Sequence, residues 1–345
     1  MNNKRNKFKF LDITRDGKGL SKTKAAANGT LKRFFISYKD NFGKITTANI
    51  LMVLGNFPLI FLIATFSGFT KVEGLLPSFD IFQNLAGYFA NTAPSAHSMS
   101  IFAHEALQSI TFKPTPLTYV FYAISALSLL TFGCVNVGTA YIFRNIAKGD
   151  PVFVWSDFWY AIKRNWKQAL PFGMIDILIN FILIFNVYTM FSSTGNFFSN
   201  TMFWCNIVIF ILYFVMRYYI YVQMLTFDLS IFKILKNSLI FSLLGFKRNA
   251  VATIGIVIII LLELAFVLGV GGILLPFGIA IPFLILFATM AYVKVYAAYF
   301  KIKDVMIDPY LAEHPEESHA DDEPIMLDDV TENERLEEIK RRNNM

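Results

Sequence analysis

Four polar residues that could do chemistry lie inside apolar stretches of the chain: Asp176, Asn180, Arg217 and Glu263. Ionisable residues at membrane depth are rare and often mark ion paths, proton relays or pairs that hold helices together. Asp176 and Arg217 flank an uncharged run, residues 177–216, whose centre predicts a turn. A hairpin folded there brings the two side chains to the same depth, and Asn180, one helical turn from Asp176, would join them.

Two interpretations of this cluster stay open. A latch between two helices needs only the ion pair, which lowers the cost of burying both charges, whereas a substrate or proton site needs an accessible group. If Arg217 instead extends to the lipid headgroups, as Lys294 near a span end is expected to do, Asp176 is left unpaired. Glu263 has no basic residue at matching depth on the next span. It is either a neutral, hydrogen-bonded carboxyl group or the proton-coupling residue of a carrier.

No catalytic motif accompanies these residues. The chain has no Gly-x-x-x-x-Gly-Lys-Ser/Thr loop, no His-Glu-x-x-His pair and no Gly-x-Ser-x-Gly elbow. Its two cysteines, Cys134 and Cys205, lie inside expected spans, where they are typical packing residues. We therefore expect a protein that is not an enzyme and that has no metal ion and no cofactor.

The elements that position the polar residues are six expected membrane spans. Charged residues make up 16% of the 345 residues, against roughly 25% in soluble domains. The deficit is concentrated in long uncharged stretches, and about 20 apolar residues suffice to cross the hydrocarbon core. The expected spans are residues 45–67, 117–143, 169–192, 201–222, 250–270 and 274–299.

Lysine and arginine residues predict the orientation of these spans. Residues 1–44 carry twelve of them, the connection 144–168 carries five and 223–249 carries four, whereas 69–115 carries only two. Connections rich in lysine and arginine face the cytoplasm. The alternation therefore predicts a multi-pass protein of the plasma membrane with both termini in the cytoplasm.

The expected fold is an all-α membrane protein of three hairpins, each preceded by a cytoplasmic interfacial helix and an elbow. A threefold repeat is indicated by similar tripeptides (Lys-Asp-Asn or Lys-Arg-Asn) at the three hairpin entrances, residues 39–41, 163–165 and 247–249. Before the second hairpin, aromatic residues and cations recur at helical spacing. This pattern suits a helix in the headgroup layer or against a docked partner. The residues concerned are Trp155, Phe158, Trp159, Lys163, Arg164, Trp166 and Lys167.

The chain divides by composition into three parts. Residues 1–44 form a basic cytoplasmic segment with an interfacial helix, and residues 45–300 form the six-span domain, whose outer loop is 69–115. Residues 301–345 carry fourteen acidic residues, a composition typical of a disordered tail. The basic segment adjoins a span and lacks a nucleic-acid-binding motif, so its expected partner is the lipid bilayer and not nucleic acid.

One stretch carries a resemblance to a known family. Gly138 and Ala140 lie at a span exit and Arg144 with Gly149 in the following loop, and then come Asp157-Phe158-Trp159 and Lys163-x-Asn165-Trp166-Lys167-Gln168. These residues resemble the YesL-like family of bacterial integral membrane proteins of unknown function. The motif similarity covers about 36 residues, 138–173, and the span layout extends it over 40–300.

The resemblance implies a Gram-positive-type bacterial origin and an association with carbohydrate uptake, and it supplies no reaction or catalytic residue. Family members are shorter, so the resemblance assigns no role to the loop 69–115 or to the acidic tail. The expected function is that of a non-catalytic accessory to carbohydrate uptake, in contact with a sugar transporter or with a second copy of itself. The alternatives are a small-molecule carrier, for a sugar or coupled to protons, and a permease-like subunit of a transport complex.

Overall fold

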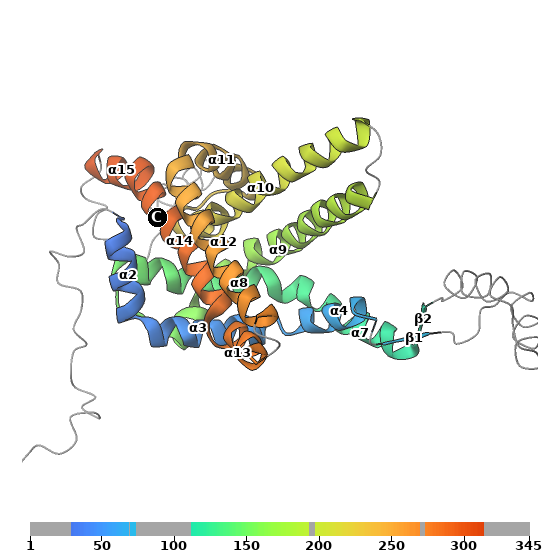
Figure 1. Cartoon of the computed structure of the whole chain (residues 1–345). Coiled ribbons are helices and arrows are strands. Elements are labelled where there is room, and N and C mark those ends of the chain that lie inside the picture. Colours follow the sequence, from blue (N-terminus) through green and yellow to red (C-terminus); the bar gives the residue numbers. More distant parts are fainter. Residues whose placement is uncertain (1–28, 69, 74–111, 193–196, 270–272, 314–345) are drawn as a thin grey trace, which may run out of the picture. The chain divides into compact units, whose positions relative to one another are not determined.

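Figure 1 shows the computed structural model of the chain, which divides into two compact units by its contacts. One unit contains residues 1–54 and 132–345, and the other contains residues 55–131. The structure describes residues 29–68, 70–73, 112–192, 197–269 and 273–313.

The described part of the larger unit is mainly helical. Its last helices are joined by two π-helical turns, η2 and η3, into one helical segment, Leu275–Glu313. In chain order the elements are α2 (Leu31–Asp40), α3 (Phe42–Gly55), α8 (Ser128–Lys148), α9 (Val154–Ser192), α10 (Phe197–Thr226), α11 (Ile231–Leu244), α12 (Phe246–Leu268), α13 (Leu275–Ile281), η2 (Pro282–Leu286), α14 (Phe287–Ile302), η3 (Lys303–Ile307) and α15 (Asp308–Glu313).

The smaller unit begins with α4 (Pro58–Phe66), which packs against α7 (Pro116–Ala126). The ring centroids of Phe61 and Phe121 are 4.9 Å apart in this contact. Between the two helices, β1 (Lys71–Glu73) pairs antiparallel with β2 (Phe112–Pro114), a short pairing that the sequence does not predict.

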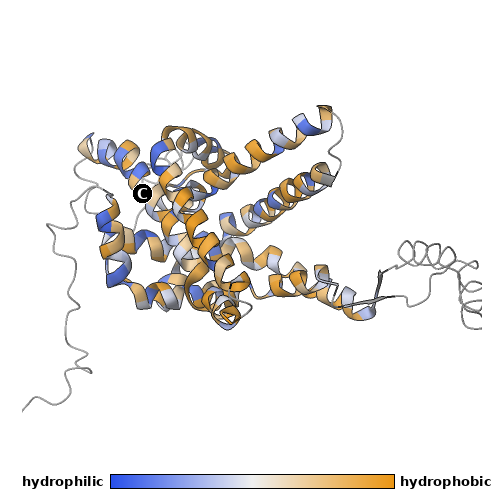
Figure 2. Cartoon of the chain, viewed as in Figure 1, coloured by the Kyte–Doolittle hydropathy of each residue, from blue (hydrophilic) through white to orange (hydrophobic). Residues whose placement is uncertain are grey.

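The structure confirms an all-α membrane protein with about six spans. In the described ranges, five helical segments are long and apolar enough to cross a membrane, and there are six if the broken pair α3 and α4 crosses as one. Figure 2 shows hydrophobic residues along α10, α12 and α13, and hydrophilic residues on α2 and α15. The five segments are Pro116–Lys148, Val154–Phe191, Phe197–Thr226, Phe246–Leu268 and Leu275–Glu313.

Two helices extend further than the apolar stretches predict. Helix α9 already begins at Val154, so no helix end separates the expected second interfacial helix from the third span. The last helical segment continues to Glu313, where the acidic composition predicts disorder. Ala161 and Ile307 lie in these extensions and are buried in the core. Tertiary packing of one face therefore sustains the helix beyond the limit of the apolar stretch.

Some expectations concern residues outside the described ranges. They are the basic segment before residue 29, residues 74–111 of the outer loop and the tail after residue 313.

Two arginines close the C-terminal ends of helices in the larger unit. Arg33 donates from Nη2 to the carbonyl oxygens of Ala147, at 3.0 Å, and Lys148, at 3.3 Å, in the last turn of α8. Arg144 donates from Nη1 to the carbonyl oxygen of Leu225, at 2.7 Å, near the end of α10. The last carbonyl groups of a helix lack partners and carry partial negative charge. These contacts therefore fix α2 to α8 and α8 to α10.

Asn49, which is buried in α3, supports the irregular start of the last span. Its Nδ2 donates to the carbonyl oxygens of Pro282, at 2.9 Å, and Phe283, at 2.8 Å, and its Oδ1 accepts from the amide of Ala288 at 2.8 Å. A proline interrupts the hydrogen bonds of a helix, and a π-helical turn shifts them. Asn49 satisfies the groups that this interruption frees.

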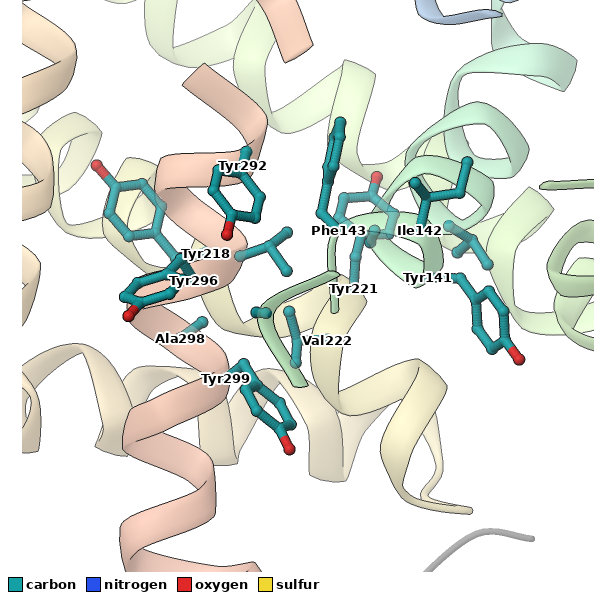
Figure 3. Close-up of a cluster of buried hydrophobic side chains, with 14 of the residues drawn as sticks. Tyr141, Ile142, Phe143, Tyr218, Tyr221, Val222, Tyr292, Tyr296, Ala298 and Tyr299 are labelled. Atoms are coloured by element: carbon teal, nitrogen blue, oxygen red, sulfur yellow. The ribbon is translucent and has the colours of Figure 1, made fainter. Parts of the chain in front are cut away.

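The buried core lies where α8, α10 and α14 meet (Figure 3). It is rich in tyrosines from the last parts of these helices, and their hydroxyl groups find partners, as buried tyrosines usually do. Tyr219 donates to Asn249 Oδ1 at 2.5 Å and Tyr292 to Ser37 Oγ at 3.0 Å. Outside the spans, burial raises the pKa of Tyr38, whose hydroxyl pairs with Thr289 at 2.8 Å.

The asparagines of the three similar tripeptides make the same kind of bond. Asn41 Nδ2 donates to the carbonyl oxygen of Ser37 at 3.0 Å, and Asn165 Nδ2 to that of Ala161 at 2.9 Å. Asn249 Nδ2 donates to the carbonyl oxygen of Ser242, also at 3.0 Å. The acceptor lies four residues earlier for Asn41 and Asn165 and seven residues earlier, in α11, for Asn249.

Candidate functional site

Asp176 is completely buried in α9 and receives hydrogen bonds from four side chains. The Nε of Arg217 lies 2.9 Å from its Oδ1 and 3.1 Å from its Oδ2. Tyr213 donates to Oδ1 and Tyr221 to Oδ2, both at 2.8 Å, and Asn180 donates from Nδ2 to Oδ1 at 2.7 Å. These donors replace the hydration that a buried carboxylate loses. These five residues join α9 to α10, and we call them the Asp176 cluster.

The facing side of α10 supplies three of the four donors. Tyr213, Arg217 and Tyr221 recur every fourth residue, so they lie along one face of the helix. The sequence pattern identified Arg217 but missed the two tyrosines. Each tyrosine is four residues from Arg217, on the helix face expected to lie opposite Asp176. This spacing could have predicted both tyrosines.

Arg217 is paired with Asp176 in this structure, so the carboxylate is not left unpaired. Its side chain is 19% exposed, against 0% for Asp176, and its guanidinium carbon lies 5.7 Å from the ring centroid of Phe132. The ring face adds a cation–π contact to the ion pair.

A second cation, Lys294 of α14, lies close to the same helices. Its Nζ is 4.8 Å from the ring centroid of Phe214 and 6.0 Å from that of Tyr218. The sequence places Lys294 at a span end with its ammonium group in the headgroup layer. Because α14 continues to Ile302, the ammonium group lies over aromatic rings instead.

Arg217 and Lys294 both line a cavity of about 150 Å³. Residues of four helices form its walls, with Met52 of α3 on one side and Phe143 of α8 on another. Asp176 and Glu263 are not among the residues that line it. The structure therefore brings Asp176, Asn180 and Arg217 together and leaves Glu263 apart.

Glu263 lies near the middle of α12. Its Oε1 is enclosed and has no hydrogen-bond partner among the residues that the structure describes. The hydrogen bond expected for a neutral structural glutamate is thus not seen for this oxygen.

Replacing Glu263 with leucine is expected to raise the free energy of unfolding by about 1–3 kcal/mol, because it removes an enclosed polar atom that lacks a partner. The measurement is thermal unfolding of the full chain in lipid nanodiscs. Glu263→Gln, which keeps the shape and polarity, serves as the control and should remain near the wild type. A less stable leucine variant would show that the folded protein provides a partner for this carboxyl group.

The first turns of α9 divide their aromatic residues between two faces. Phe158 is 4% exposed and packs against Gly138, where a Cβ atom would lie 2.6 Å from its ring. The three tryptophans, at positions 155, 159 and 166, are 64%, 43% and 51% exposed. Lys163, Arg164 and Lys167 are also exposed. The expected aromatic stripe is therefore divided: Phe158 packs into the core, and the three tryptophans face outward.

Among the described residues, no group of three or more histidine, cysteine, aspartate or glutamate side chains is placed to hold a metal ion.

Comparisons with known proteins assign no function to the chain. No family model matches the chain, and neither a curated protein nor a solved structure matches it.

Proposed function

We propose that this protein is a non-catalytic integral membrane protein that assists carbohydrate uptake by docking against a sugar transporter. The observation that carries the proposal is the closed Asp176 cluster. Its carboxylate is fully enclosed and hydrogen-bonded, so the strongest candidate for chemistry within the spans acts as a latch between helices. The proposed setting is the plasma membrane, with both termini in the cytoplasm, which the lysine and arginine distribution supports.

The first turns of α9 supply the proposed docking surface, which consists of Trp155, Trp159, Lys163, Trp166 and Lys167. Phe158 holds this segment to the core, and the rings of Trp155 and Trp159 contact each other at 6.1 Å. Tryptophan is enriched among the residues that dominate protein–protein interfaces, and rigid presentation lowers the entropy cost of binding. The resemblance to the YesL-like family points to a sugar transporter as the partner.

A photo-crosslinking amino acid at position 159 is expected to capture a subunit of a sugar transporter in native membranes, identified by mass spectrometry. Trp204 of α10 is the matched control, since it is 64% exposed and its neighbour Phe203 contacts Phe191 at the opposite end of α9. Crosslinking at position 204 should recover lipid. Deleting the protein should lower uptake of the captured transporter's sugar, and only wild type, not a triple alanine variant at 155, 159 and 166, should restore it.

Two results would contradict the accessory role. The first is recovery of lipid alone at both crosslinking positions. The second is full restoration of uptake by the triple alanine variant. A dimer captured at position 159 would point to self-association instead.

A carrier is the second candidate function, and the cavity beside Arg217 is the observation that favours it. Its volume of about 150 Å³ is below the roughly 300–1,000 Å³ of typical ligand pockets, which supports a small solute better than a sugar. Purified protein in liposomes would accumulate such a solute. In a proton-coupled carrier, Glu263→Gln would also change the pH dependence of uptake. A permease-like subunit remains a third possibility, which co-purification with an ATPase subunit would support.

A further inference from the structure

Arg217 uses only part of its guanidinium group in the Asp176 cluster. Both short contacts to the carboxylate are made by Nε. Within the described ranges, Nη1 and Nη2 donate no hydrogen bond. These two atoms form the fork that binds a phosphate or carboxylate with two parallel hydrogen bonds. Arg217 is one of the residues that line the cavity, and its fork has no acceptor among the described residues.

Lys294 brings a second unused donor to the same cavity. Among the described residues, its ammonium group forms no ion pair, and it lies over the rings of Phe214 and Tyr218. Aromatic faces stabilise a cation but accept no conventional hydrogen bond from it. The three N–H donors of the ammonium group therefore also lack an acceptor.

The charged side chains near the cavity carry more positive than negative charge. With Arg217 and Lys294 both protonated, the carboxylate of Asp176 balances one of the two cations and leaves one positive charge over. An unbalanced charge at membrane depth is costly. The polar side chains of Asn136 and Thr139, which also line the cavity, are neutral and do not compensate this charge.

We propose that the cavity between α3, α8, α10 and α14 binds one anionic phosphate group, held by the Arg217 fork and the Lys294 ammonium. A phosphate oxygen pair accepts from Nη1 and Nη2, a further oxygen accepts from Nζ, and the negative charge of the phosphate offsets the excess positive charge of the site. The apolar part of the lining includes Met52, Phe143 and Met290.

The volume of the cavity, about 150 Å³, suits a headgroup fragment and not a whole lipid. An anionic phospholipid would place its phosphate in the cavity and its chains outside, whereas free phosphate would occupy the cavity alone. A second cavity, of about 380 Å³, is lined between α9 and α10 by apolar residues and Tyr188, and offers no cation for a phosphate. The anion site therefore depends on the two cations and not on hydrophobic enclosure.

The test measures binding to the purified full chain in neutral detergent. One arm titrates dioctanoyl phosphatidylglycerol, with dioctanoylglycerol, which lacks the phosphate, as the control, and follows complexes by native mass spectrometry. The other arm titrates radiolabelled inorganic phosphate by equilibrium dialysis. Saturable binding of the phosphate-bearing compound in either arm, without binding of dioctanoylglycerol, is expected and identifies the source of the phosphate.

Lys294→Met keeps the length of the side chain and removes the charge, so it should weaken phosphate-group binding by about ten- to hundredfold, the effect of losing charge-assisted hydrogen bonds. Lys301→Met is the matched control, because it removes the same charge one to two turns further along α14, outside the cavity lining, and should leave affinity unchanged. Ala291→Leu fills the cavity and keeps both cations, so it should weaken binding as well.

Three results would overturn the proposal. They are absence of saturable binding in both arms, equal weakening by Lys294→Met and Lys301→Met, and wild-type affinity in Ala291→Leu. The Ala291 variant keeps the test decisive if Lys294→Met does not fold, because it alters the space and not the charge.

Discussion

Replacing Asp176 with leucine is expected to lower the free energy of unfolding by about 3–5 kcal/mol, the cost of breaking a buried ion pair from one side. The change leaves the guanidinium of Arg217 enclosed without its carboxylate, and the hydroxyl groups of Tyr213 and Tyr221 lose their acceptor. Equilibrium unfolding of the full chain in mixed micelles measures the effect. Asp304→Leu is the matched control, because the Arg248–Asp304 pair is 28% and 42% exposed and such pairs contribute at most about 1 kcal/mol.

The double variant Asp176→Leu with Arg217→Met distinguishes a latch from a functional site. Removing both charges together should restore the part of the lost stability that comes from the unpaired guanidinium, since apolar residues often replace a buried ion pair without cost. The hydroxyl groups of Tyr213 and Tyr221 still lack their acceptor in the double variant, so recovery stays incomplete. An additive loss in the double variant would mean that the two side chains do not stabilise each other. If the double variant is stable but abolishes transport in liposomes, the cluster is part of a carrier and the accessory role is wrong.

Replacing Gly173 with alanine is expected to destabilise the protein by about 3 kcal/mol, at the upper end of the usual cost of overpacking. Helices α8 and α9 cross here with their backbones in contact. A Cβ atom on Gly173 would lie 2.5 Å from the Cα atom of Gly133, and one on Gly133 would meet the carbonyl oxygen of Ala169. Backbone atoms cannot rotate away as a side chain does, so the two helices must separate.

Gly255→Ala is the matched control for this crossing. Gly255 also lies inside a helix, α12, but a Cβ atom there has no neighbour within 4 Å. Alanine should therefore raise the free energy of unfolding by about 0.5–1 kcal/mol, the ordinary gain over glycine in a helix. The measurement is thermal unfolding of both variants in the same detergent. Equal effects at positions 173 and 255 would rule out a close approach of α8 and α9.

The spans could be predicted because a long stretch without charged residues is visible in the local sequence, whatever the chain contacts elsewhere. The run 177–216 also predicted a turn, and with it the pairing of Asp176 and Arg217 at one depth. Helix boundaries were predicted less well. The start of α9 and the end of the last helical segment lie in polar sequence, where contacts such as those of Ala161 and Ile307 with the core decide whether a helix continues.

Only part of the Asp176 cluster could be predicted, because its remaining members depend on contacts between helices. Composition identifies a charge at membrane depth, but which residues surround it depends on how each helix is rotated about its axis. Tyr213 and Tyr221 are ordinary aromatic residues of a span until α10 turns them toward α9. Phe158 and Trp159 are adjacent in sequence, yet one packs into the core and the other faces outward.

The sequence by itself determined that this is a multi-pass, all-α membrane protein, because hydrophobicity and charge act on each segment separately. Only the tertiary structure decided that Arg217 bonds to Asp176 through Nε alone, and that Lys294 lines the same cavity as Arg217. Those outcomes depend on which helices become neighbours and on the faces that they present, and no local property of the chain specifies either.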